Sequence, residues 1–484
     1  MVLLALLTTA SDAKAQSAPV APGEVSLTPA TVDSKTWDLA RCLHSALQHS
    51  PQVQQQRLVV RAADEKQGEA RSHLFPRVTW ESQVYALSQL YDPIVVRSGA
   101  YGEMFVPSPG GSGYITSLPP RDVELLEAGP TEFASTRVRL QQPLFTWGRI
   151  LLGMQLAELQ HRFEQANLRA TGYETAYLVR QLYLGLLLAD ASLELLSQMH
   201  GEMGRILDDT RALEAQGLVT PAAALEAAAN LRQIEQEQAR TEAEKVRARE
   251  ALRLLVGASD DDAMAITGRL DSLEAITLTD ENALIDSALA ARPELESRTL
   301  QLHLAERQVA LRQAEDLGRP TLALAAETGL RGDRLPLVRT NWTMAWDHYW
   351  MAGLVLQVPL FDGFEAHSKV NQAQTQRSQA ELGVEQTRGL VRAEVRQRRA
   401  QVEARLREQV YARAREAERA EKYRVAEHSY ASNTTNRSEF LGAHLEWSEA
   451  RTSALLSTYL LHLAQLELDH ASGRLPRSPG EVSR

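Results

Sequence analysis

The strongest pattern in the chain is a helical repeat of apolar residues. After residue 150, such side chains recur in alternating steps of four and three, at Leu152, Leu156, Leu159, Phe163, Ala166, Ala170, Tyr173 and Tyr177. A more polar stripe of similar period lies near the C-terminus, at Leu445, Ser448, Thr452, Leu455, Tyr459, Leu463 and Leu466. A seam of this kind is typical of helices that pack side by side in a coiled coil.

Two long stretches, Arg149–Gln216 and Glu365–Tyr430, contain no proline. A continuous helix over either would be a rod of roughly 100 Å. Because rods of that length do not fit inside a globule, we expect them to pack side by side in a coiled-coil assembly.

Four short segments follow a period of two instead. They lie after Pro76 and Pro320 and before Pro143 and Pro359. The residues that share one face of each segment are Val78, Trp80, Ser82, Val84 and Ala86 after Pro76; Leu322, Leu324 and Ala326 after Pro320; Val138 and Leu140 before Pro143; and Trp350, Ala352, Leu354, Leu356 and Val358 before Pro359. Strands with one apolar face are typical of membrane barrels. For one segment alone, a hairpin capping a soluble helical bundle is the better interpretation; all four together favour the barrel.

Segments rich in glycine and proline separate the paired strands. We expect Tyr91–Glu132 and the shorter Arg331–His348 to be irregular extracellular loops. The run Pro107–Gly113 lacks the strand–turn–helix context of a phosphate-binding loop.

The two halves of the chain repeat the same plan. Leu43–Leu47 recurs as Ile285–Leu289, each followed by a proline, and Leu140–Phe145 recurs as Leu356–Phe361. Each half therefore reads helix, strand, loop, strand, long helix, turn, helix.

We expect the chain to divide at a few points. Residues 1–15 have an apolar run, Val2–Ala10, and small residues around Lys14, as in a secretory signal peptide. No Lys or Arg precedes that run, which leaves the true start codon open. The further divisions are an N-terminal extension (16–36), the first repeat (37–256), an equatorial connector (257–279), the second repeat (280–470) and a polar C-terminal tail (471–484).

Charge and composition exclude several classes of protein. The net charge is −10, with acidic and basic residues interleaved, so there is no basic stripe for nucleic acid. The single cysteine, Cys42, rules out a disulfide within the chain and is expected to be a small core residue.

After the expected signal peptide, we find no apolar run that approaches the length of ~18 residues needed for a membrane helix. A secreted chain without one is soluble or inserted as a β-barrel.

The sequence offers no catalytic or metal-binding constellation. The histidines are scattered, and we find no His-Glu-x-x-His, paired cysteines, Gly-x-Ser-x-Gly or phosphate loop. Asp260–Asp262 fits a solvated loop better than a metal site, and His44 and His49 share no helical face well. We therefore predict no enzymatic activity, no metal and no cofactor.

About four strands cannot close a barrel with a lumen, and open edges are not tolerated in lipid. Several chains must therefore share one barrel if these strands enter a membrane. Three copies would supply about twelve strands, within the range of outer-membrane barrels.

From about Trp37 to His470 the chain resembles the TolC family of outer-membrane efflux proteins. The most specific marks are two strand-end motifs in register, formed by Gln141, Pro143, Leu144, Phe145 and by Gln357, Pro359, Leu360, Phe361. The resemblance implies a homotrimer with a twelve-stranded barrel in the outer membrane and a helical tunnel through the periplasm. It also implies a passive duct without cofactor, which docks with a periplasmic adaptor and an inner-membrane pump of an efflux or type I secretion system.

By that resemblance, two helix–turn–helix regions form the periplasmic tip and dock the adaptor. Their turns contain Gly217, Leu218, Val219, Thr220 and Ser432, Asn433, Thr434, Thr435. Thr220 with Pro221 predicts a helix start.

Many relatives carry aspartates just after the second turn, where this chain has Ser438 and Leu441. Candidate gate residues are therefore Arg437, Ser438, Glu439 and Leu441, with Leu441 as a hydrophobic constriction. Glu439 fits a capping box with Asn436 equally well, and Arg437 fits an ordinary surface residue.

A soluble periplasmic coiled-coil scaffold or pump adaptor is the alternative. It explains the rods and the signal, but not four alternating strands in matching places. An adaptor would also carry a compact β-rich domain, which we do not find.

Overall fold

The computed structural model describes residues 36–86, 94–126, 132–259, 264–273, 276–316, 318–332, 346–432 and 434–476. The expected signal peptide, nearly all of the N-terminal extension, Asp260–Asp262, Asn433 and residues 477–484 lie outside the described residues.

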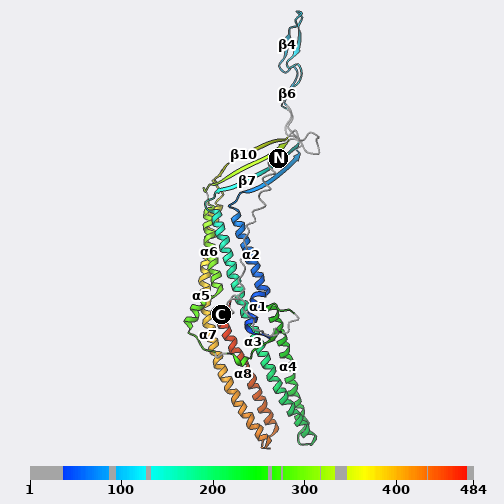
Figure 1. The fold of residues 1–484 in the computed structure, drawn as a ribbon, viewed down its shortest axis with the longest axis vertical. Coiled ribbons are helices and arrows are strands. Elements are labelled where there is room, and N and C mark those ends of the chain that lie inside the picture. The colour runs from blue at the N-terminus through cyan, green and yellow to red at the C-terminus, as the bar shows by residue number, and fades with distance from the viewer. Residues whose placement is uncertain are drawn as a thin grey trace, which may run out of the picture.

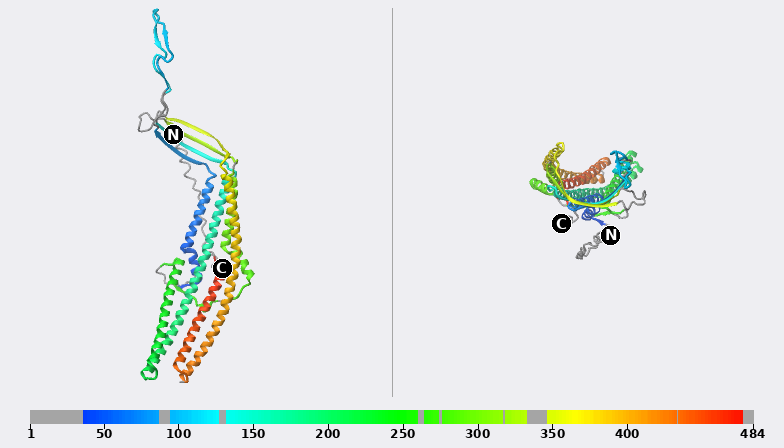
Figure 2. Two further views of the ribbon diagram at one scale, coloured as in Figure 1. Left: turned by 180° about the vertical axis from the view of Figure 1, so that it is seen from behind. Right: turned by 90° about the horizontal axis from the view of Figure 1, so that it is seen from above.

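The molecule is an elongated stack of helices with a sheet at one end (Figure 1). The predicted rods are two helices of 67 residues each, α3 (Arg149–Ala215) and α7 (Glu365–Ala431). Each returns through a shorter helix, α4 (Pro221–Val256) or α8 (Arg437–Ala471). Seen from above, the elements follow an arc rather than a closed bundle (Figure 2).

Short helices precede the sheet strands in both halves, and each pair starts in the same way. Asp38 caps α1 (Leu39–His49) and Asp280 caps α5 (Glu281–Ala291), each through its carboxylate. A proline opens the next helix in both halves, α2 (Pro51–Ser72) and α6 (Pro293–Ala314). The repeated sequence therefore specifies repeated helix starts.

The four predicted strands form one antiparallel sheet in the order β10-β9-β7-β2. They are β2 (Arg77–Ala86), β7 (Glu132–Phe145), β9 (Thr321–Gly332) and β10 (Trp346–Gln357). The central pair, β7 and β9, joins the two repeats. The fold prediction of long helices with four strands and an internal repeat is confirmed.

The expectation that Tyr91–Glu132 is irregular is wrong. This segment contains β3 (Ile94–Val96), β4 (Glu103–Val106), β5 (Tyr114–Ser117) and β6 (Val123–Leu126). β3 pairs with β6 and β4 with β5, both antiparallel. Short apolar runs between the glycines and prolines carry this pairing, and sequence periodicity is weak in strands of three or four residues.

A hydrophobic core lies where the short helices meet α3. Cys42 is fully buried there, as predicted, with Leu186 and Val256. Burial raises the pKa of the Cys42 thiol to about 12, so it is inert at neutral pH. Nearby, β1 (Thr36–Trp37) pairs in parallel with β8 (Ala265–Ile266), followed by the 3₁₀ turn η1 (Leu270–Ser272).

One expectation about apolar character needs correction. Helix α3 does contain an 18-residue window apolar enough to cross a membrane. It packs against α1, α2, α4, α6 and α8, so it needs apolar residues on more than one side. Within the expected polar tail, Ser472 and Leu475 are buried against the body.

Candidate functional site

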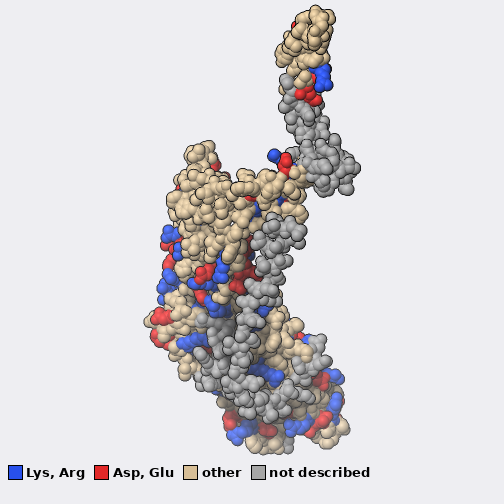
Figure 3. Space-filling model, turned by 45° about the horizontal axis from the view of Figure 1, so that its top comes forward, with Lys and Arg blue, Asp and Glu red and all other residues tan. Residues whose placement is uncertain are grey.

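The sheet has one apolar and one charged face. Cross-strand register places Val78, Trp80 and Val84 of β2 in rows with the even-numbered residues of β7, β9 and β10. Trp80 and Trp350 are 76% and 75% exposed in the single chain. On the face in Figure 3, charged side chains gather over the helices, and the surface over the sheet is mostly uncharged. An exposed apolar sheet face of this kind suits lipid.

The other face carries a cluster of ion pairs. Arg137 Nη2 lies 2.6 Å from Glu81 Oε2, and Arg139 Nε lies 2.9 Å from Glu327 Oε2. The Tyr349 hydroxyl donates to Glu327 at 2.8 Å. Gly329 stands opposite Arg137, where an added Cβ would lie 2.9 Å from the arginine Cβ. The glycine therefore leaves room for the arginine on this polar face.

The sheet ends in two unpaired edges among the described residues. β2 pairs only with β7, and β10 pairs only with β9. A strand edge in lipid leaves backbone N–H and C=O groups without partners, at a cost of several kcal/mol per group. The single chain is therefore incomplete as a membrane structure.

The two strand-end motifs lie where the sheet joins the long helices. Leu144 and Phe145 end β7, while Leu360 and Phe361 follow β10 and are 88% and 75% exposed. Of the remaining motif residues, Gln141 and Pro143 lie within β7, Gln357 ends β10, and Pro359 follows it. Exposed aromatic and apolar side chains at this level fit the boundary between membrane and water.

Each motif is followed by two consecutive residues in the left-handed conformation, which the sequence reading missed. These are Trp147 (φ 52°) with Gly148 (φ 78°), and Gly363 (φ 69°) with Phe364 (φ 67°). Each pair leads directly into α3 or α7. The glycines Gly148 and Gly363 were the available signal, because glycine adopts this conformation without strain.

The first predicted tip turn is confirmed as a turn between helices. Gly217 has φ 74°, and the amide of Leu218 donates to the carbonyl of Leu213 at 3.0 Å, as in a glycine-terminated helix end. Leu218 is 68% exposed, Val219 is half-buried and Thr220 is exposed. Thr220 occupies the N-cap position before Pro221, but its side chain makes no capping hydrogen bond.

The second tip turn is held by side chains. The hydroxyls of Ser432 and Thr434 donate to His428 and Ser429 carbonyls, each at 2.9 Å, and Thr435 donates to Glu439 at 2.6 Å. Asn436 accepts from the amide of Glu439 at 2.9 Å, so the expected cap is present. The Glu439 side chain is therefore part of the turn and is exposed. Arg437 and Ser438 are the first residues of α8.

Leu441 lies in a core rather than on an open face. It is 4% exposed and packs in a cluster with Met203 and Ile206 of α3 and Ile234 of α4. Stacked rings extend the cluster, with Tyr423 and Trp447 centred 4.8 Å apart. Burial raises the pKa of Tyr423 to about 12. With 4% of its surface exposed, Leu441 packs in this core, whereas a hydrophobic constriction requires a side chain that faces the lumen.

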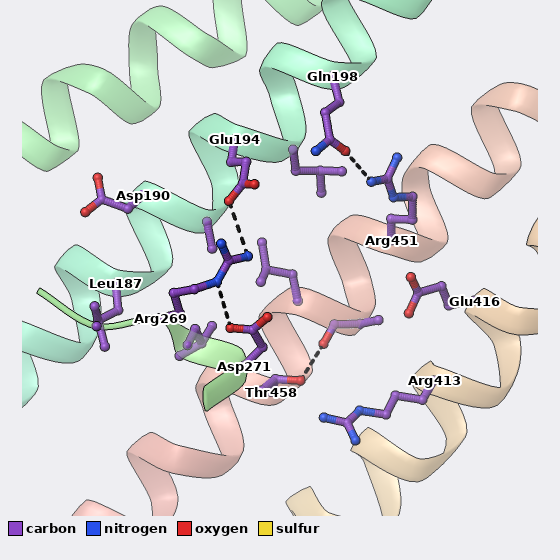
Figure 4. A pocket seen from close by; sticks show the side chains of 16 residues that line it. Leu187, Asp190, Glu194, Gln198, Arg269, Asp271, Arg413, Glu416, Arg451 and Thr458 are labelled. Carbon is purple, nitrogen blue, oxygen red and sulfur yellow. Dashed lines mark hydrogen bonds and ion pairs between the residues drawn. The ribbon is translucent and has the colours of Figure 1, made fainter. Parts of the chain in front are cut away.

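A cavity of about 550 Å³ lies between α3, α7, α8 and η1. Charged side chains line it, and they are largely paired: Arg269 bonds Asp271 at 3.2 Å, and Arg451 donates to Gln198 at 2.7 Å (Figure 4). Among the described residues, no group of three or more His, Cys, Asp or Glu side chains could hold a metal ion. The cavity is a polar recess between helices without a reactive constellation.

Comparison with known proteins decides the assignment. The model of the outer membrane efflux protein family matches residues 42–258 and 284–474. The chain belongs to this family. The match in two parts follows the internal repeat, and the resemblance to TolC-like efflux proteins is confirmed. None of the curated proteins matches the sequence.

Solved structures share the fold of this efflux family member. A membrane protein from Pseudomonas aeruginosa is 21% identical with a TM-score of 0.69, covering 90% of this chain and 92% of that one. The CmeC outer membrane channel of Campylobacter jejuni is 16% identical with a TM-score of 0.68, covering 91% and 86%. The MtrE outer membrane channel of Neisseria gonorrhoeae, in its open state, is 14% identical with a TM-score of 0.68, covering 91% and 90%.

Family membership confirms the predicted efflux function and the outer-membrane location. It also decides against the soluble scaffold or pump adaptor. The family is one of outer membrane efflux proteins, and the CmeC and MtrE neighbours are outer membrane channels rather than enzymes.

Proposed function

We propose that three copies of this chain form one continuous duct across the outer membrane and periplasm. The observation that carries the proposal is the four-stranded sheet with one exposed apolar face and two unpaired edges. Pairing β2 of one copy with β10 of the next removes every open edge. Three sheets of this kind give a barrel of about twelve strands, with the ion-pair face of Arg137 and Glu327 inside.

The duct is passive and carries no catalytic chemistry, cofactor or metal. An inner-membrane pump supplies the energy, and a periplasmic adaptor joins the pump to the tip of the duct. The exposed Leu218 and the hydroxyl-rich turn around Thr434 support docking at the tip, since each lies at the turn between two long helices. We assign adaptor docking to Gly217–Thr220 and Ser432–Thr435.

The periplasmic gate involves the first turn of α8. Glu439 supports this assignment because it is exposed and is fixed by Thr435 and Asn436 at a helix start. A carboxylate there favours cations in the aperture, and three copies would give a ring of charge. Arg437 and Ser438 share that turn. Leu441 is left out because it is buried.

Deletion in cells that retain the matched pump and adaptor tests the efflux role. We expect greater sensitivity to exported compounds, restored by the wild-type chain. A control in cells that lack the pump should show no further effect of the deletion. Unchanged sensitivity with the pump present would contradict the proposal.

A further inference from the structure

Residues 94–126 form a single two-stranded ribbon, which we call the β-ribbon. The β3–β6 and β4–β5 pairs are connected through backbone hydrogen bonds, from Tyr101 to the Leu118 carbonyl at 3.0 Å and from Leu118 to the Gly102 carbonyl at 2.7 Å. The β-ribbon projects from the end of the sheet away from the helices (Figure 1). Each arm spans roughly 40 Å if fully extended.

The outer part of the β-ribbon exposes apolar side chains on both faces. Met104 lies opposite Thr116, and Phe105 opposite Ile115, so the two rows point to opposite sides. Met104, Phe105, Tyr114 and Ile115 are 46%, 61%, 61% and 66% exposed. An isolated two-stranded hairpin is marginally stable in water, and an exposed apolar patch with free strand edges marks an interaction surface.

The aromatic ring at the centre of this surface is already positioned. A Cβ on Gly113 would lie 1.9 Å from Cζ of Phe105, so the ring covers the glycine of the opposite arm. One ring face is thus supported within the β-ribbon, and the remainder is exposed. A side chain held in this way loses little conformational entropy when a partner covers it.

The position of the β-ribbon indicates which partner covers it. It leaves the sheet after β2, the edge strand that pairs with the next copy in the proposed trimer. Four strands per copy, at about 4.8 Å each, set neighbouring β-ribbons roughly 20 Å apart around the rim. The β-ribbons are longer than this separation and can lean together. With two arginines and three acidic residues, they carry no positive excess that would draw them onto a phosphate-bearing membrane surface.

We propose that the three β-ribbons of one assembly pack against each other through Met104, Phe105, Tyr114 and Ile115, forming an extracellular turret over the barrel mouth. This inference rests on the trimer proposed above. The occupant of each apolar surface is the same surface of the neighbouring copies. The turret would carry the exit of the duct away from the membrane surface.

Distances between spin labels in the purified full-length protein test the turret. Cys42 is fully buried, so a cysteine introduced at the surface is the labelled site. Nitroxide labels at Ile115→Cys, and separately at Thr116→Cys on the other face, report the outer part of the β-ribbon. A label at Val95→Cys reports its base. Pulsed electron paramagnetic resonance in nanodiscs then gives the distances between copies.

The turret predicts narrow label distances at positions 115 and 116 that are no longer than those at position 95, near the spacing of roughly 20 Å at the rim. Adding Phe105→Lys to the Thr116→Cys protein should broaden that distribution, and Ser108→Lys at the turn should leave it unchanged. Longer or broad distances at 115 and 116 in a protein of trimeric mass would overturn the turret alone. A monomeric mass would overturn the trimer and the turret with it.

Discussion

The imidazole Nε2 of His444 lies 3.0 Å from Oε2 of Glu202 and joins α8 to α3. His444 is fully buried, with its ring edge-on to Tyr423 at 5.3 Å. A carboxylate only accepts hydrogen bonds, so Nε2 carries the proton that it donates. The contact connects the helical hairpin α3–α4 to the hairpin α7–α8 at the level of the core that contains Leu441.

His444→Ala should destabilise the protein by about 2–4 kcal/mol, because it leaves a cavity and removes the partner of Glu202. The expected readout is a lower Tm of the purified protein. His200→Ala is the matched control, since His200 is on α3 with a side chain that is 42% exposed. Equal Tm values for the two variants would contradict a structural role for the His444 contact.

The environment of Glu174 predicts that the stability of the folded chain depends on pH. The hydrogen bond from His470 at 2.8 Å lowers the pKa of Glu174 below its ordinary value of 4.5, with a smaller contribution from Arg292. The ionised carboxylate therefore stabilises the fold at neutral pH, and this stabilisation is lost as the pH falls through the lowered pKa.

Glu174→Gln should accordingly reduce stability at pH 7 by at most about 1 kcal/mol, because the Glu174 side chain is half exposed and screened. Unfolding curves should show the difference from wild type shrinking as the pH falls below the ordinary pKa of 4.5. A difference that grows as the pH falls below that value would reverse the sign and contradict this account.

Substitutions of two adjacent residues on β2 test which face of the sheet contacts lipid. Val84→Lys places a charge on the apolar face and should cost about 2–4 kcal/mol near the middle of the bilayer, less near its surface. Gln83→Lys places the same charge on the ion-pair face and should be tolerated. The measure is the yield of folded protein in the outer membrane. Equal yields would mean that the faces are assigned wrongly.

Two substitutions test separately the second tip turn and the hydrophobic core that lies next to it. Leu441→Ala should lower stability by about 2–5 kcal/mol, because it opens a cavity beside Met203. Glu439→Ala should leave the core intact and change conductance or its cation preference. Wild-type conductance and selectivity in Glu439→Ala would show that Glu439 is not part of the gate.

The sequence predicted the large elements well because their patterns are long. Both 67-residue helices lack proline, and each strand of the sheet has several alternating residues beside a proline. The β-ribbon was missed because β3 to β6 have only three or four residues each, too few for a period to show.

The candidate site was harder to predict residue by residue. Its position relative to the second turn made Leu441 a candidate gate residue. Whether its side chain faces a lumen or a core depends on α3 and α4, which are distant in sequence. The cap at Asn436 was predictable because it depends on residues within one turn. The Arg137–Glu81 and Arg139–Glu327 pairs required the strand register, which the sequence alone did not specify.

Ionic current through the purified protein in a planar lipid bilayer tests the central claim most directly. If three sheets close into one barrel, insertion of a trimer should produce discrete and reproducible steps of conductance. Trimers that insert into the bilayer and never conduct, including after Glu439→Ala, would contradict a continuous duct.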